Sequence, residues 1–346
     1  MKKLYTTYEW KQLSKRRSLR ELKRKKEKKQ REIKRRRSLE RRGLYVEQKP
    51  YRGVKRKRDR DEITAPSVFS LTGNVEETLH FFHEVNNIVK NHHNVYFDLS
   101  KVASLTTDAI LYILSRIEYN RSHNLHVNIL GNEPKDDKCN SLFQKSGFFT
   151  FVKSARSSEP VNDANTFSIK SGLGVNPSIA DEATAFALRC LRKKKSRSSR
   201  SIYRTIIECM GNVDHAYEEK NPYRKWWLMA YYDKDNKKVH FTFLDNGYTI
   251  PTTIKKKYFE RIKEIIKLSK DGELIYSALL GKFRSRTGES HRGNGLPFIR
   301  KAAKQGTISN LRILSRSGLV NCTNENDAVE NINKRFHGTM LCWDFE

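Results

Sequence analysis

Hydrophobic and polar residues are distributed differently in successive parts of the chain. Residues 8–42 contain no Gly or Pro, which favours a helix, but their apolar residues are too sparse to pack a stripe against a core. Like charges repel along this segment, so on its own it is expected to be a frayed helix or disordered. Residues 43–65, with Gly43, Pro50 and Gly53, are typical of a linker. We therefore predict an N-terminal arm with its linker over residues 1–62.

Strand and helix patterns alternate from residue 66 to residue 155. The predicted strands are short and apolar, and the segments between them have apolar residues at helical spacing. The expected helices are 74–90, 106–121 and two short ones within 141–152, and the expected strands are 94–100 and 125–131. This alternation predicts a small α/β domain.

A polar stretch without periodicity, residues 160–178, is interpreted as a domain boundary. The remainder, 178–346, again combines helices with strands. The expected helices are 179–195, 201–219, 254–269 and 296–306, and the expected strands are 226–233, 238–245, 310–318 and 338–345. The predicted fold class is α/β, with a two-layer α/β sandwich in this C-terminal domain, whose helices cover one face of a mixed sheet.

Charge is concentrated at the N-terminus. The chain of 346 residues carries a formal charge of +30, of which residues 1–60 contribute 27 − 7 = +20 and the other 286 residues 42 − 32 = +10. Phosphates would relieve the repulsion within the arm, so we expect non-specific, salt-sensitive binding to DNA or RNA; a solvating tail or a basic targeting signal is the alternative. The candidate contacts are Lys15, Arg16, Arg17, Arg24, Lys25, Arg35, Arg36 and Arg37.

Cysteine usage and hydropathy bear on location. The five cysteines are odd in number and widely spaced, without a Cys-x-x-Cys pair or a His/Cys cluster, so no zinc site is expected. This favours a reducing compartment, most simply the cytoplasm. We find no secretory signal and no run of about 18 apolar residues, so no membrane contact is expected.

Four short motifs carry candidate chemistry. Glu208 and Asn212 lie one helical turn apart, followed by His215. Downstream, the strand ending in "FLDNG" places Asp245 before a turn with Gly247. The stretch "HRGNGLPF" places Gly293 and Gly295 just before a helix, where glycine permits close approach of a polyphosphate and free N–H groups attract anions. Finally, Thr339 begins the last strand.

In this order the motifs resemble the GHKL ATPase superfamily of gyrase B subunits, MutL proteins, heat-shock chaperones and sensor histidine kinases, whose Bergerat fold would cover about residues 178–346. The resemblance implies ATP and Mg²⁺ as ligands. It implies that Asn212 coordinates Mg²⁺ and that Glu208 orients or deprotonates the attacking water. The remaining implied roles concern the nucleotide: Asp245 binds the adenine amino group with support from Thr339, Gly247 leaves room for the base, and Gly293 and Gly295 shape the phosphate end of a lid.

Two positions depart from the family pattern. Thr249 stands where the family has a second glycine, so it is expected to stiffen or narrow the adenine pocket. His215 replaces a carboxylate; it could hold Glu208, contact a phosphate or cap the helix. The lid segment brings four further candidates for a γ-phosphate contact, and the sequence does not select among Lys282, Arg284, Arg286 and Arg292.

Residues 66–155 resemble a STAS domain, the fold of anti-sigma factor antagonists, through "VYFDLSKVASLTTDAILYIL". Thr107 occupies the phospho-acceptor position, although Thr106 replaces the preceding acid and Ala109 the glycine. This resemblance keeps a protein-kinase function open, as the alternative to ATP hydrolysis and to a non-hydrolysing ATP-gated scaffold. The stretch "HEVNN" superficially resembles a phospho-acceptor box, but His83 is expected to be a half-buried helix residue.

The function expected from the sequence is Mg·ATP binding and hydrolysis. Nucleotide binding would order the lid from about residue 250 to residue 292 and move it against the STAS-like domain, a protein partner or a second subunit. The arm would hold this ATPase on nucleic acid. The unusual combination of domains suggests a role in phage defence or in a mobile element.

Overall fold

The structure, a computed structural model, describes residues 60–346 except 92, 123–126, 153–162, 216–224, 259–269 and 284–293, together with residues 23, 24, 27, 30 and 31. The chain divides into two compact units, Met1–Arg58 and Asp59–Glu346. The described residues of the first unit are helical and exposed. Of the eight basic residues proposed to contact nucleic acid, they include Arg24; the other seven lie outside the described part.

The first half of the second unit has its own small sheets. Strands β1 (Arg60–Thr64), β3 (Asn94–Asp98) and β5 (Ile129–Gly131) form a parallel sheet in the order β1-β3-β5, and β2 (Val68–Phe69) pairs with β4 (Ser104–Leu105). The helices are α2 (Val75–Lys90), α3 (Thr107–Ser122), α4 (Asp137–Lys145) and α5 (Phe148–Phe151). This confirms the predicted alternation. The expected linker 43–65 is wrong at its end, because residues 60–64 pair with β3 as a strand.

The second half contains a seven-stranded sheet in the order β11-β10-β9-β12-β8-β7-β6. The strands are β6 (Thr166–Gly172), β7 (Trp226–Asp233), β8 (Lys238–Asp245), β9 (Ser309–Ser315), β10 (Gly318–Cys322), β11 (Asp327–Asn331) and β12 (Thr339–Phe345). Every neighbouring pair is antiparallel, so the prediction of a mixed sheet is wrong. Short turns between β7 and β8 and between β9, β10 and β11 enforce this arrangement.

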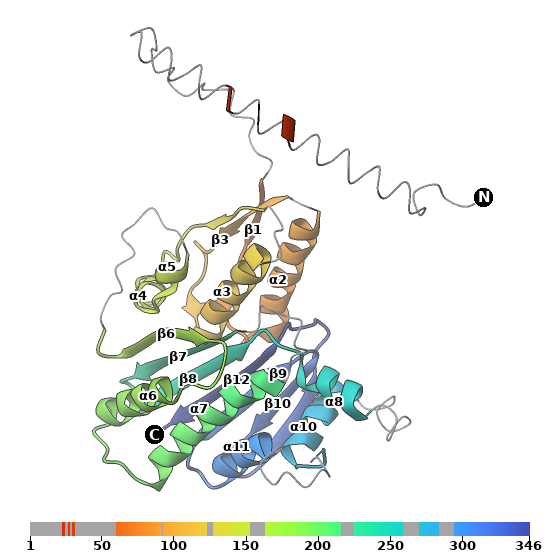
Figure 1. The fold of residues 1–346 in the computed structure, drawn as a ribbon. Helices are drawn as coiled ribbons and strands as arrows, with labels where there is room; N and C mark the ends of the chain where they lie inside the picture. Colours follow the sequence, from red (N-terminus) through yellow and green to blue (C-terminus); the bar gives the residue numbers. More distant parts are fainter. Residues whose placement is uncertain are drawn as a thin grey trace, which may run out of the picture. The chain divides into compact units, whose positions relative to one another are not determined.

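Helices cover one face of this sheet (Figure 1). They are α6 (Pro177–Cys190), α7 (Arg197–His215), α8 (Ile250–Tyr258), α10 (Asp271–Leu279) and α11 (Gly295–Lys304). Two sequence predictions need correction here. The presumed boundary 160–178 contains β6, a partly polar edge strand, and the helix predicted from residue 254 already begins at Ile250, while residues 259–269 lie outside the described part.

The other face of the sheet packs on the first half of the same unit. Trp227, Met229 and Leu244 belong to one hydrophobic core with residues of α2, α3 and β3. On the opposite side, Trp226 and Leu228 join the core beneath α6 and α7. Because β7 is buried on both faces, its sequence is a continuous apolar run rather than an alternation. The two halves therefore share a core across the central strands. Among the helices in the described part of the chain, none combines the length and the apolar composition of a membrane-spanning segment.

Candidate functional site

A row of polar side chains crosses the helix-covered face of the sheet. Thr339 of β12 pairs with Asp245 of β8 on one side and with Ser315 of β9 on the other. The hydroxyls of Ser315 and Thr339 lie 3.0 Å apart, and both side chains are buried. Val239, Phe241 and Phe243, the alternate residues of β8, pack beneath the helices, so Asp245 points to the same side. At this row, the apolar residues of the core give way to hydrogen-bonding groups.

Asp245 is a buried carboxyl group with one hydrogen bond described. It is 6% exposed, and the N–H of Gly247 donates to its Oδ1 at 2.7 Å. Burial raises the pKa of Asp245 to about 7, and the Gly247 N–H opposes this shift. A carboxyl group that is so poorly solvated gains from a ligand that donates a hydrogen bond to it.

The backbone next to Asp245 is held tightly. The N–H of Lys225 donates to Asn246 Oδ1 at 2.8 Å, which fixes the turn after β8. On the other side, Gly338 has φ of +96°, and a Cβ there would lie 2.0 Å from the carbonyl oxygen of Asp245. Only glycine can therefore occupy position 338 while β12 approaches β8 in this way.

Helix α7 presents the second part of the site. Its apolar stripe is buried in the core between the helices and the sheet and consists of Ile202, Ile206, Cys209, Met210 and Val213. Glu208 and Asn212, one turn apart, are half-buried beside that stripe. Burial and then the charges of Asp245 and Glu208 hold the pKa of the Cys209 thiol well above its usual range, so both acids lie near this buried cysteine.

The start of α11 closes on Glu208 and Asn212. A Cβ placed on Gly295 would lie 2.9 Å from Glu208 Oε2 and 3.4 Å from Asn212 Oδ1. The structure thus brings together three residues that are separated by up to 87 positions and that the motifs singled out. Because position 295 has no side chain, the start of α11 can approach a carboxylate and an amide oxygen this closely.

Arg204 connects the same two helices. Its Nε lies 3.3 Å from Glu208 Oε1, one turn along α7, and its guanidinium carbon lies 4.0 Å from the ring centroid of Phe298 on α11. The arginine therefore orients the Glu208 carboxylate and contacts α11 through a cation–π interaction.

The other predicted site residues are placed less completely. Gly247 lies in the turn after β8, and Thr249 is the N-cap of α8, since its Oγ1 accepts from the N–H of Thr252 at 3.3 Å. Lys282 is exposed in the turn after α10. His215 is the last described residue of α7, but its side chain lies outside the described part. Gly293, Arg284, Arg286 and Arg292 are also outside it.

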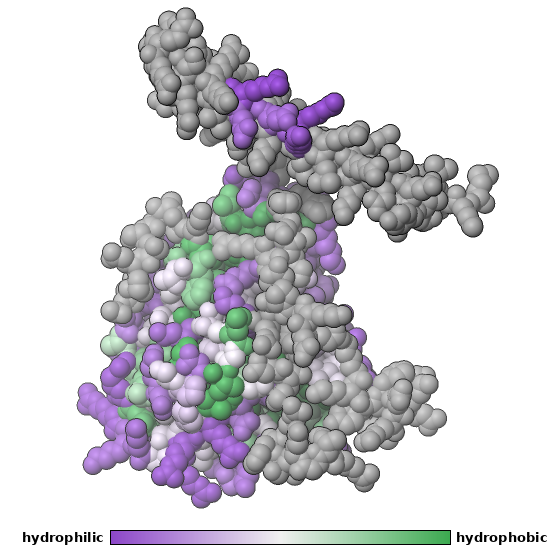
Figure 2. Space-filling model, in the orientation of Figure 1, coloured by the Kyte–Doolittle hydropathy of each residue, from purple (hydrophilic) through white to green (hydrophobic). Residues whose placement is uncertain are grey.

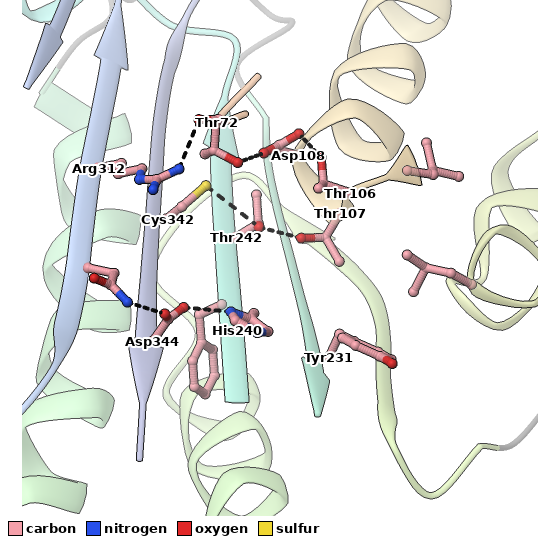
Figure 3. A pocket seen from close by; sticks show the side chains of 14 residues that line it. Thr72, Thr106, Thr107, Asp108, Tyr231, His240, Thr242, Arg312, Cys342 and Asp344 are labelled. Carbon is pink, nitrogen blue, oxygen red and sulfur yellow. Dashed lines mark hydrogen bonds and ion pairs between the residues drawn. The ribbon is translucent and has the colours of Figure 1, made fainter. Parts of the chain in front are cut away.

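A second candidate site is a cavity of about 330 Å³ on the opposite face of the sheet, under the start of α3 (Figure 3). The floor carries His240 and Thr242 of β8 with Asp344 of β12, and the roof carries Thr107 and Asp108. His240 Nδ1 lies 2.6 Å from Asp344 Oδ1, and this hydrogen bond raises the pKa of His240. Asp108 accepts hydrogen bonds from Thr72 Oγ1 at 2.7 Å and the Leu71 N–H at 2.9 Å.

The start of α3 is joined to β8 inside this cavity. Thr107 Oγ1 and Thr242 Oγ1 lie 2.6 Å apart, and Thr107 is 7% exposed. The hydroxyl at the predicted phospho-acceptor position therefore faces the sheet, not solvent. His83 is half-buried, as predicted, and its Nε2 contacts the backbone of Arg335 at 3.0 Å and 3.1 Å.

Several residues of both sites were missed in the sequence. Arg204 looks like an ordinary i, i+4 partner of Glu208, and Ser315 lies in a segment predicted only as a strand. Gly338 could have been found from the sequence. It directly precedes Thr339, a candidate site residue that begins a strand, and a glycine at such a position indicates close approach of the backbone. Thr242 left none, because its role depends on the distant α3.

Comparisons with family models, with curated proteins and with solved structures find no match to this chain. In the described part, no three His, Cys, Asp or Glu residues are grouped so that they could hold a metal ion by themselves. The site nevertheless brings a carboxylate and an amide oxygen next to a helix start, where the first backbone N–H groups have no partner within the helix. Such a set suits an anionic ligand together with a metal ion, because the anion would supply some of the oxygen ligands that the metal needs.

Proposed function

We propose that residues 166–346 form an ATP-binding domain of the GHKL type that hydrolyses ATP. The observation that carries this proposal is the approach of Gly295 to Glu208 and Asn212, beside a sheet on which Asp245 is buried. The order of the motifs along the sequence points to the same residues. The all-antiparallel sheet with helices on one face is compatible with a two-layer sandwich.

In the proposed complex, the adenine amino group donates to Asp245. The ionised carboxylate is the acceptor that such a contact requires, and a donor at this position would offset part of the cost of burial that raises the pKa of Asp245. Thr339, paired with Asp245 across the strands, would complete the row of polar groups. Gly247 would leave the base room at the turn.

The residues present fit Mg²⁺ as the accompanying metal. Asn212 Oδ1, which lies beside Gly295, would hold it. Magnesium is commonly bound by one or two protein oxygens together with phosphates and water, which agrees with the lack of a three-residue cluster in the described part. When bound, the metal would neutralise phosphate charge.

Glu208 would act on the attacking water. Its carboxylate would accept the proton while the water oxygen bonds to the γ-phosphorus and the bond to the β–γ bridging oxygen breaks, with ADP as the leaving group. Arg204, through its contact with Glu208 Oε1, would keep Oε2 turned toward Gly295 and the phosphates. The N–H groups at the start of α11 would contact the phosphate oxygens.

The rest of the chain would connect this ATPase to a partner. We propose that the arm, residues 1–60, binds the phosphate backbone of DNA or RNA, because two thirds of the chain's net charge lies there. The STAS-like half would respond to nucleotide through β8, whose Asp245 faces the nucleotide and whose Thr242 bonds to Thr107 on the other side.

The test uses γ-labelled ATP with Mg²⁺, in the presence and absence of nucleic acid, and separates free phosphate from protein-bound label. Free phosphate that disappears in Glu208→Ala supports hydrolysis. Label on the protein that is lost in Thr107→Val would establish the kinase alternative, for which α3 would first have to leave the sheet, because the Thr107 hydroxyl is buried. Binding of ATP with neither product would identify a nucleotide-gated scaffold instead.

A further inference from the structure

A second concentration of positive charge lies on the folded body, where α6 ends and α7 begins. Residues 189–200, "RCLRKKKSRSSR", contain seven Lys or Arg and no Asp or Glu. Residues 61–346 carry +10 in total, so this corner supplies 7 of that excess and the other 274 residues only 10 − 7 = +3. We call these seven residues the basic corner: Arg189, Arg192, Lys193, Lys194, Lys195, Arg197 and Arg200.

The backbone of the basic corner is well defined. Arg192 has φ of +53° and the N–H of Lys193 donates to Leu188 O at 2.9 Å, a turn that ends α6 with a left-handed residue. Ser196 then caps the start of α7: its N–H donates to Ser199 Oγ at 2.9 Å, and its Oγ accepts from the Ser199 N–H at 3.4 Å. The charges are therefore presented on a fixed frame rather than on a loose tail.

Most of these cations are available to a ligand. Lys193 contacts the backbone oxygen of Glu346 and lies over the ring of Phe345, and Arg189 lies 5.5 Å from the ring of Phe186. The remaining five are exposed and have no carboxylate partner among the residues that the structure describes: Arg192, Lys194, Lys195, Arg197 and Arg200. Figure 2 shows hydrophilic side chains gathered at the lower left, where α6 leads into α7.

We propose that the basic corner is a second binding site for the phosphate backbone of nucleic acid, on the body and separate from the arm. Uncompensated cations at close spacing match a polymer with a regular row of negative charges, from which they would release counterions. The positive end of the 19-residue α7 adds to the attraction. This proposal deepens the proposed association with nucleic acid by assigning part of it to the folded unit.

Other polyanionic partners fit this surface less well. Stable binding to an anionic membrane would require exposed apolar or aromatic side chains that enter the headgroup region, and every exposed residue of 189–200 is polar or charged. A specific protein interface usually has an apolar or aromatic centre and few lysines. A second copy of this chain is also unsuitable, since the body carries no compensating acidic excess.

The test measures binding of the full chain to labelled DNA and RNA duplexes of about 30 base pairs, from about 50 mM to about 300 mM KCl. The corner variant combines Lys194→Gln, Lys195→Gln, Arg197→Gln and Arg200→Gln. The control removes four exposed charges elsewhere, with Lys101→Gln, Lys135→Gln, Lys138→Gln and Lys234→Gln. Each lost phosphate contact should lower the magnitude of the slope of log K against log salt by about 0.9, so the four substitutions of the corner variant should lower it by up to about 3.6 and weaken binding at least about tenfold at low salt.

A corner variant that keeps the wild-type slope, or loses no more than the control, overturns the proposal. The outcome for the arm is separate and comes from a variant with its eight candidate cations replaced by Gln. Residual binding in the arm variant that disappears when the corner changes are added supports both sites. Loss of all binding in the arm variant, with the corner variant unaffected, assigns the nucleic acid to the arm alone. The proposal would also be contradicted if the corner substitutions weakened binding of the chain to anionic vesicles but not to DNA or RNA.

Discussion

A methyl group on Gly295 would lie 2.9 Å from Glu208 Oε2, closer than non-bonded atoms normally approach. The start of α11 and the middle of α7 are therefore in contact at Gly295 and Glu208. The contact is to the flexible end of a side chain, so a larger residue at position 295 can be accommodated if Glu208 moves.

Gly295→Ala is accordingly expected to fold normally and to lose turnover. A displaced carboxylate no longer lies within hydrogen-bond reach of the attacking water, and a shift of about 1 Å can cost on the order of 100-fold in rate. The stability change should stay below about 1 kcal/mol. The control is Gly211→Ala on the same α7, where the nearest atom outside the helix would be Val175 Cγ2 at 3.9 Å. Equal loss of phosphate release in both variants would show that the close approach of Gly295 to Glu208 has no special role.

Glu208→Gln should separate binding from turnover. The amide keeps the size of the side chain but cannot accept the proton of the attacking water, and loss of a general base typically costs about 100- to 10,000-fold. ATP affinity, measured by equilibrium titration, should remain within a few fold of the wild type. Full phosphate release by this variant would assign the base to another residue.

Asp245→Asn should abolish ATP binding and at the same time make the protein more stable above neutral pH. Burial raises the pKa of Asp245 to about 7 from 3.8, so between these values the folded chain holds a proton that the unfolded chain releases. Wild-type stability therefore falls relative to the Asn variant as pH rises from about 4 to about 7 and the difference stays constant above.

The measurement is the midpoint of thermal or urea unfolding of both proteins from about pH 4.5 to about pH 8.5, with ATP affinity measured in parallel. A constant difference over the whole range would mean that Asp245 is not buried in the folded state. ATP affinity equal to the wild type would overturn the nucleotide assignment while leaving the burial intact.

Some of the fold followed directly from local patterns. The apolar runs 226–233 and 238–245 predicted β7 and β8, and the spacing in 296–306 predicted α11. Because side-chain direction along helices and strands is periodic, Glu208 and Asn212 could be placed on one helix face. Their proximity to Gly295, by contrast, came from the resemblance, since no local rule joins α7 to α11.

The remainder depended on contacts that a local pattern does not contain. Residues 166–172 are partly polar because β6 is an edge strand with a neighbour on one side, and residues 60–64 become a strand only by pairing with β3. The apolar residues of β7 that face α3, such as Trp227, are explained only by the core that the two halves share. A linear sequence shows that such residues are buried but not against what.

The hydrogen bond between Thr107 and Thr242 should couple the two halves of the unit. Thr107→Val leaves the Thr242 hydroxyl buried with only the weak Cys342 S–H donor described, so it should destabilise the protein by about 1 to 3 kcal/mol. The double variant with Thr242→Val removes both polar groups and should be less destabilised than the sum of the single variants. Urea unfolding of the four proteins measures this coupling, and strict additivity would show that the two hydroxyls do not interact.

Arg204 should link nucleic acid at the basic corner to turnover at Glu208. Arg197, Arg200, Arg204 and Glu208 follow one another at three- and four-residue spacing along α7, and Arg204 is already paired with Glu208 at 3.3 Å. A phosphate bound at the corner would compete for Arg204 and free the carboxylate, so duplex DNA or RNA should change the rate of ATP hydrolysis in the wild type. Arg204→Gln should hydrolyse ATP at a rate that nucleic acid no longer changes, whereas Lys138→Gln, an exposed residue outside the basic corner, should keep the response. An Arg204→Gln protein that responds like the wild type would exclude this route between the two sites.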